Sequence, residues 1–137
     1  MRRSATPANW WRADMGQAMP PRSILIVEDE PFIRYDLVDF FEDRGFRVFE
    51  AEDADEAIGL LDANHAIRIV LTDVQMPGSM DGVKLAHHVR DRYPPTILIV
   101  VSGMVNPTSA ELPARALFVS KPFDPRYVLR EIERLSS

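Results

Sequence analysis

The chain has 137 residues, 46% hydrophobic and 27% charged, which is typical of one water-soluble domain with a buried core. It contains no cysteine, which excludes disulfide bonds and thiolate metal sites and agrees with a cytoplasmic location. No apolar run approaches the roughly 20 residues of a membrane-spanning helix, so we expect no membrane partner. The net charge of −5 argues against direct binding to nucleic acid.

Residues 1–22 differ from the rest of the chain in charge and in pattern. They contain Arg2, Arg3 and Arg12 and show no hydrophobic periodicity. We expect a flexible tail here and a single domain over residues 23–137. Trp10 and Trp11 are exceptional, because two adjacent indole rings are unfavourable in water. Docking of this pair on the domain or on a partner is therefore a second interpretation.

From Ser23 onward, strand patterns alternate with helix patterns. The predicted strands cover residues 23–27, 46–50, 67–73, 96–101 and 116–119. The predicted helices begin near Pro31, Asp53, Met80 and Asp124, and their inward faces include Ile33, Leu37, Phe41, Val128, Ile132 and Leu135. This alternation predicts a parallel sheet with helices on both faces. Between the last two strands, Pro113 limits any helix to about two turns.

Residues suited to phosphoryl chemistry follow the predicted strand ends. Glu28 and Asp29 follow the first strand, Asp73 ends the third, Ser102 ends the fourth and Lys121 follows the fifth. The carboxyl ends of parallel strands share one edge, where open α/β sheets bind their ligands. Taken singly, each residue is equally well explained as a cap, a turn residue or a solvated side chain. Their joint placement favours a functional site.

These residue types together suit transfer of a phosphoryl group. Carboxylates close together repel unless a cation binds or a proton is taken up, and Mg²⁺ prefers such oxygen ligands. Lys121 can pair with an acid or a phosphoryl oxygen, and the Ser102 hydroxyl can donate to another. Asp73 can then act as the nucleophile that forms an acyl phosphate, while Mg²⁺ and Lys121 neutralise the transferring group.

Over residues 23–135 the sequence resembles the receiver domain of two-component response regulators. The resemblance lies in Ile-Leu-Ile-Val-Glu-Asp-Glu-Pro at 24–31, Leu-Thr-Asp-Val-Gln-Met-Pro at 71–77, Met-Asp-Gly at 80–82, Val-Ser-Gly at 101–103 and Lys-Pro-Phe at 121–123. It implies a flavodoxin-like (βα)5 fold, a doubly wound parallel sheet with strand order 2-1-3-4-5.

The resemblance also assigns roles to individual residues. Asp73 would accept a phosphoryl group from a histidine kinase. Mg²⁺ would be bound by Asp29, Asp73 and the backbone carbonyl of Gln75, and by Glu28 through water.

The remaining assignments concern the response to phosphorylation. Ser102 and Lys121 would contact the phosphoryl group, and the peptide bond before Pro122 would be cis. Ser102 and Phe118 would act as the switch residues, although Phe118 lacks the hydroxyl group of the tyrosine that is frequent there. The segment from Ser102 to Lys121 is shorter than usual, so we expect a short or irregular fourth helix. Since that face often forms the family's dimer, a homodimer stays open as an alternative.

Three functions are compatible with these residues. The first is a stand-alone phosphoacceptor that is not an enzyme, apart from taking part in its own phosphorylation and slow dephosphorylation. Its partners would be a sensor histidine kinase or a histidine phosphotransfer protein. Because no output domain follows in the sequence, it would signal by protein contacts or phosphoryl relay. The second is a degenerate receiver that binds partners without phosphorylation. The third is an aspartate-nucleophile phosphohydrolase, which is disfavoured because Gln75 stands where such enzymes carry a second acid.

Overall fold

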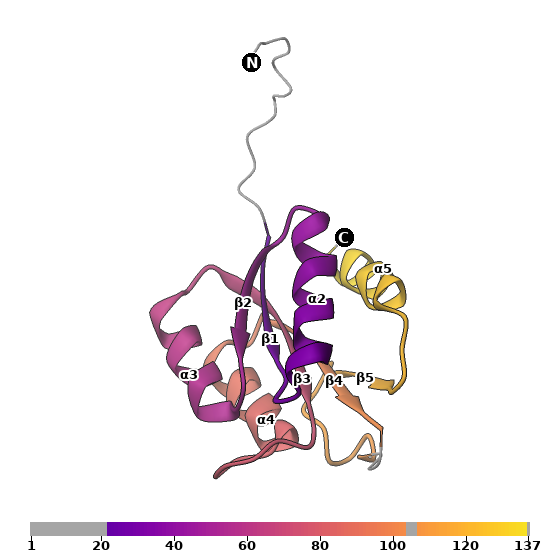
Figure 1. The fold of residues 1–137 in the computed structure, drawn as a ribbon. Coiled ribbons are helices and arrows are strands. Elements are labelled where there is room, and N and C mark those ends of the chain that lie inside the picture. The colour runs from indigo at the N-terminus through magenta and orange to yellow at the C-terminus, as the bar shows by residue number, and fades with distance from the viewer. Residues whose placement is uncertain (1–21, 104–106, 137) are drawn as a thin grey trace.

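The structure is a computed structural model that describes residues 22–103 and 107–136. The predicted tail lies outside these residues except for Arg22, so its flexibility and the docking of Trp10 and Trp11 stay predictions. The described residues form one parallel sheet with helices on both faces (Figure 1).

Five parallel strands form the sheet in the order β2-β1-β3-β4-β5, which confirms the predicted topology. They are β1 (Ser23–Val27), β2 (Arg47–Ala51), β3 (Ile67–Asp73), β4 (Ile97–Ser102) and β5 (Leu117–Ser120). The central strands β1, β3 and β4 are rich in branched apolar residues because helices cover both of their faces. Their carboxyl ends lie at one edge, which carries the residues singled out by sequence.

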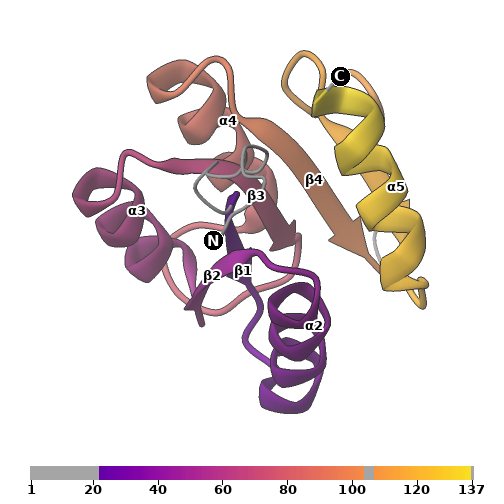
Figure 2. The ribbon, with the colours of Figure 1, turned by 90° about the horizontal axis from the view of Figure 1, so that it is seen from above.

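Helices α3 and α4 cover one face of the sheet, and α2 and α5 cover the other (Figure 2). Their bounds are α2 (Pro31–Asp43), α3 (Ala54–Ala63), α4 (Gly82–Arg92) and α5 (Pro125–Ser136). The first three begin at acidic N-caps whose side chains accept a backbone N–H three residues on, namely Glu30, Asp53 and Asp81. Among the described residues, no helix has both the length and the apolar character needed to cross a membrane.

Two predicted inward-facing residues are not buried. Ile33 is 37% exposed and Leu135 is 40% exposed, whereas Leu37, Phe41, Val128 and Ile132 are buried as predicted. The physical reason is position along the helix, because Ile33 lies in the first turn of α2 and Leu135 in the last turn of α5. Ile33 instead lines a cavity of about 560 Å³ together with residues of the β5–α5 loop.

The connection between β4 and β5 is irregular, as expected, but its described part lacks the short helix that Pro113 would still have allowed. Its described part, residues 107–116, forms turns and contains no α-helix. These turns line an open cavity of about 410 Å³, and its wall includes Leu112, Pro113 and Phe118. Arg115 has a φ of 64°, a left-handed conformation that is uncommon for a residue other than glycine. The helix expected of a complete (βα)5 alternation is therefore replaced here by turns.

Candidate functional site

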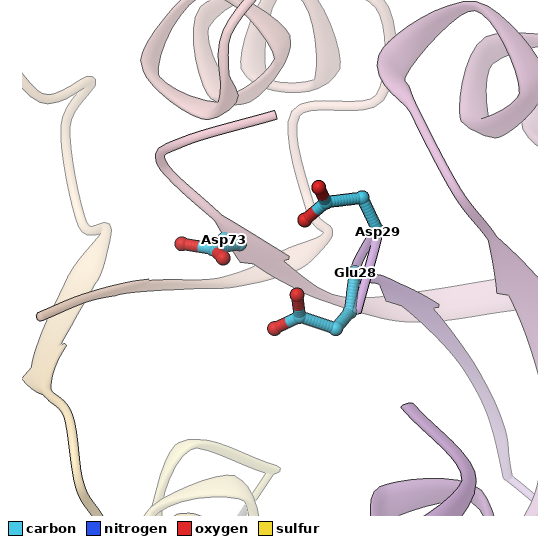
Figure 3. Close-up of side chains that lie close together, drawn as sticks. All are labelled: Glu28, Asp29 and Asp73. Atoms are coloured by element: carbon cyan, nitrogen blue, oxygen red, sulfur yellow. The ribbon is translucent and has the colours of Figure 1, made fainter. Parts of the chain in front are cut away.

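Three carboxylates gather at the carboxyl ends of two adjacent strands, β1 and β3 (Figure 3). Glu28 and Asp29 directly follow β1, and Asp73 is the last residue of β3. One oxygen from each lies within 4.8 Å of the other two. Glu28 and Asp73 are buried, with 3% and 8% of their surface exposed, whereas Asp29 is exposed. We call these residues the acidic cluster.

Lys121 bridges the two buried acids from the end of β5. Its Nζ donates to Asp73 Oδ2 at 2.9 Å and to Glu28 Oε1 at 3.0 Å. The Lys121–Pro122 peptide bond is cis, as the resemblance implied, and the Lys121 backbone N–H donates to Ser102 O at 2.9 Å. Lys121 thus joins the end of β5 to the carboxyl ends of β1 and β3 through its ammonium group and to that of β4 through its backbone.

Burial and hydrogen bonding act in opposite directions on the charges of this site. Burial raises the pKa of Glu28, and hydrogen bonds from the Glu30 N–H and from Lys121 only partly offset it. Burial alone would lower the pKa of Lys121, but its hydrogen bonds to Asp73 and Glu28 raise that pKa overall. Lys121 therefore stays protonated at neutral pH, whereas burial disfavours the charged form of Glu28.

Asp73 is held by the backbone on both sides. After it, the Val74 N–H donates to Val101 O at 2.9 Å and continues the ladder between β3 and β4. The Gly82 N–H donates to Val74 O at 2.8 Å, so the first residue of α4 packs directly under the end of β3. A Cβ at Gly82 would overlap the Asp73 carbonyl oxygen, so only glycine fits there.

The other predicted site residues also lie at this edge. The exposed Gln75 donates its N–H to Asp73 Oδ1 at 3.3 Å, which places its backbone beside the acidic cluster. Ser102 is buried at the end of β4, one residue beyond the Val101 that pairs with Asp73. Phe118 lies on β5, is half-buried and packs against the core layer under α3 and α4. It also lines the cavity under the β4–β5 connection, so it joins the site edge to that irregular segment.

Sequence reasoning missed the role of Arg34, and it noted Gly82 only as part of the Met-Asp-Gly motif, without its contact under Asp73. Arg34 lies on α2 and is buried, and its Nη1 donates to the backbone carbonyl of Glu28 at 2.8 Å. A signal was present, because Arg34 precedes Leu37 and Phe41 by three and seven residues and so shares their apolar face. A charged residue on the inward face of a helix calls for a buried partner.

The donor set of the acidic cluster suits a small, hard divalent cation. All three candidate ligands are carboxylates, and Asp29 leaves the cluster open to solvent. The pKa of Glu28 is raised chiefly by burial, which disfavours its charged form, and the nearby Asp73 adds to this effect. A cation bound beside Glu28 would favour that charged form.

Comparison with known proteins agrees with this geometry. The model of the response regulator receiver domain family matches residues 24–133. The response regulator receiver protein CpdR of Brucella abortus (strain 2308) is 31% identical over 118 residues, 83% of this chain and 96% of that protein. The transcriptional regulatory protein ResD of Bacillus subtilis (strain 168) is 33% identical over 115 residues, 82% of this chain and 47% of that protein.

A solved structure shows the same fold. The response regulator receiver protein from Sinorhizobium medicae WSM419 superimposes with a TM-score of 0.79 at 24% identity, covering 86% of this chain and 96% of that one. Several curated relatives are longer, and the chain spans about half of their length or less. The matched region contains the acidic cluster and the whole sheet except Ser23. The chain therefore belongs to the response regulator receiver domain family.

Proposed function

We propose that this receiver domain accepts a phosphoryl group on Asp73 from a phosphohistidine of a sensor kinase or a phosphotransfer protein. The observation that carries the proposal is the contact of Lys121 Nζ with Asp73 Oδ2 beside Glu28 and Asp29. The ammonium group of Lys121 pairs with one oxygen of the Asp73 carboxylate and so orients it. The acidic cluster is open to solvent on the side of the exposed Asp29.

Transfer needs one bond broken and one formed. The bond between phosphorus and the histidine nitrogen breaks, a bond forms between phosphorus and an Asp73 carboxylate oxygen, and the imidazole takes up a proton. Asp29, Asp73 and the Gln75 carbonyl would hold Mg²⁺, with Glu28 acting through water, and the bound ion would neutralise charge on the phosphoryl oxygens. Lys121 and Ser102 would contact those oxygens.

The partners and the output follow from the same proposal. The chain acts in the cytoplasm as a phosphoacceptor, not as an enzyme with multiple turnover, and it signals through contacts of its own surface. Phe118 supports this view, because it joins the end of β5 to the cavity under the β4–β5 connection. A change at Ser102 and Phe118 would therefore alter the shape of that surface.

Intact-protein mass spectrometry tests the proposal. With acetyl phosphate and Mg²⁺, we expect the wild-type chain to gain the mass of one phosphoryl group and Asp73→Asn to gain none. Asp81→Asn is the matched control, because Asp81 is a nearby N-cap and asparagine caps equally well. Equal labelling of Asp73→Asn and wild type would refute the assignment. Failure of labelling by both acetyl phosphate and a phosphorylated kinase, despite measured Mg²⁺ binding, would support a degenerate receiver. Steady turnover of phosphate esters would support a phosphohydrolase.

A further inference from the structure

Arg34 is a buried cation that the proposed phosphoryl transfer does not use. Only 7% of its surface is exposed, although it lies on α2 two turns before Phe41. Its Nε donates to Glu50 Oε1 at 2.9 Å, and its Nη1 donates to Glu28 O at 2.8 Å. One guanidinium group therefore links the edge strand β2 to the turn that carries the acidic cluster.

The contact with Glu28 fixes a peptide group that the cluster depends on. The Glu28 N–H donates to Ala51 O at 3.0 Å, which extends the ladder between β1 and β2 by one residue. The Glu28 carbonyl accepts from Arg34 and belongs to the peptide unit that also contains the Asp29 nitrogen. Because a peptide unit is planar and rigid, fixing that carbonyl also orients the backbone of Asp29. Asp29 is exposed, so packing around its own side chain constrains it little.

The ion pair with Glu50 removes an electrostatic disadvantage. An unpaired positive charge next to the acidic cluster would oppose the binding of a divalent cation. Glu50 lies on β2 opposite Ile26 and pairs directly with the Arg34 guanidinium. Arg34 and Glu50 together therefore bring hydrogen-bond donors to the cluster without adding net charge.

We propose that Arg34 is a positioning residue for divalent-cation binding, which holds the Glu28–Asp29 peptide while Glu50 neutralises its charge. This inference rests on the proposed function of the acidic cluster as a Mg²⁺ site. Arg34 does not touch the cation or the phosphoryl group, and it acts through the backbone of the turn.

The sign of the effect separates this role from its rivals. Removing a positive charge near a cation site should tighten Mg²⁺ binding if electrostatics alone operates. A purely structural arginine would lower the free energy of unfolding but leave the Mg²⁺ affinity of the folded chain unchanged. If Arg34 positions the ligands, replacing it with a neutral residue weakens Mg²⁺ binding, although a positive charge has been removed.

Calorimetric titration of the full chain with MgCl₂ measures this sign. We expect Arg34→Met to weaken Mg²⁺ binding about tenfold, the lower end of the range for residues that orient metal ligands. Arg34→Lys keeps the charge but lacks the planar fork that reaches both acceptors, so we expect a similar loss. If circular dichroism shows that Arg34→Met is unfolded, the Arg34→Lys variant provides the test.

Arg90→Met is the matched control. Arg90 is also a buried arginine that donates to backbone carbonyls, but its partners Pro94, Thr96 and Ala114 precede β4 and β5 at the opposite edge of the sheet. We expect its Mg²⁺ affinity to equal that of wild type. Unchanged or tighter Mg²⁺ binding in the folded Arg34 variants would overturn the inference about Arg34 but not the proposed function. Absence of Mg²⁺ binding in wild type would overturn the proposed function and this inference with it.

Discussion

The acidic cluster and the β4–β5 connection both lie at strand ends, yet they are held in different ways. The two buried acids of the cluster are supported by direct contacts, from Arg34 to the Glu28 carbonyl, from Gly82 under Asp73 and from Lys121 between the two carboxylates. Each of these contacts reaches a backbone carbonyl or a carboxylate that belongs to the site. The position of the carboxylates is therefore determined by short, direct interactions.

The described part of the β4–β5 connection, residues 107–116, is contacted by one neighbouring helix. The His87 ring lies 2.7 Å from Glu111 O, and Arg90 Nε donates to Ala114 O at 2.9 Å, both from α4. A cavity of about 410 Å³ lies beneath these turns, and Arg115 has a left-handed backbone. The comparison shows that direct contacts fix the strand ends that carry the chemistry. The turns beside Phe118 instead lie along a cavity and depend on contacts from side chains of α4.

Breaking the support of the acidic cluster should have the largest effect. Gly82→Ala places a methyl group on the Asp73 carbonyl oxygen, so α4 or the end of β3 must shift. We expect a loss of about 3 kcal/mol in the free energy of unfolding, measured by urea denaturation. The folded fraction should also be phosphorylated more slowly, because Asp73 is displaced.

Gly59→Ala is the control for this substitution. Gly59 lies within α3, and a Cβ there would meet no atom within 4 Å. Alanine is favoured over glycine inside a helix by up to about 1 kcal/mol, so this variant should be slightly more stable than wild type. A Gly82→Ala variant as stable as Gly59→Ala would show that the contact under Asp73 is not tight.

Loosening the segments that precede β4 and β5 should cost less and should spare the chemistry. Arg90→Met removes the donor for three backbone carbonyls, and we expect the free energy of unfolding to fall by about 2 kcal/mol. Labelling by acetyl phosphate should keep its wild-type rate, because these carbonyls lie at the edge away from Asp73. Thermal unfolding and mass spectrometry on the same samples measure both quantities.

Arg92→Met provides the control for Arg90. Arg92 is exposed, and its ion pair with Asp62 is 3.6 Å long, so its loss should change the free energy of unfolding by less than about 0.5 kcal/mol. Slower labelling in Arg90→Met than in Arg92→Met would contradict the separation of the two regions.

The sheet and the positions of the acids could be predicted because each depends on local pattern. The run of branched residues that ends at Asp73 marks a buried strand, and parallel strands bring their carboxyl ends together whatever the details of packing. The order of the strands and the cis bond before Pro122 came from the resemblance, not from the pattern of residues. The acidic N-caps were likewise predictable, because a cap interacts only three residues along the chain.

The supporting contacts could not be predicted because they join segments that are distant in the sequence. Arg34 meets Glu50 across the β1–β2 pairing, and Gly82 meets Asp73 only because α4 packs under β3. Pro113 predicted a helix of at most about two turns between β4 and β5, but the described residues of that connection form turns instead. Those turns depend on His87 and Arg90 of α4, whose acceptors are backbone carbonyls and so leave no pattern in the sequence.

The smallest expected effect concerns the charge of Glu28. Burial raises the pKa of Glu28 above its ordinary value of 4.5. A carboxyl group whose pKa is raised by folding stabilises the fold fully below pH 4.5, and this contribution is lost as the pH rises through its folded-state pKa. Glu28→Gln is neutral at every pH. Without Mg²⁺, we therefore expect it to be more stable than wild type at pH 7, with a difference that shrinks as the pH falls toward 4.5.

Urea unfolding of both proteins between pH 4.5 and pH 7 measures this difference, with the exposed Glu42→Gln as the control. A Glu28→Gln variant that is less stable than wild type at pH 7 would mean that the bond to Lys121 outweighs the cost of burial. The expected result has a functional consequence, because a carboxylate that destabilises the chain without Mg²⁺ is stabilised when a cation binds beside it. Added Mg²⁺ should then raise the stability of wild type more than that of Glu28→Gln.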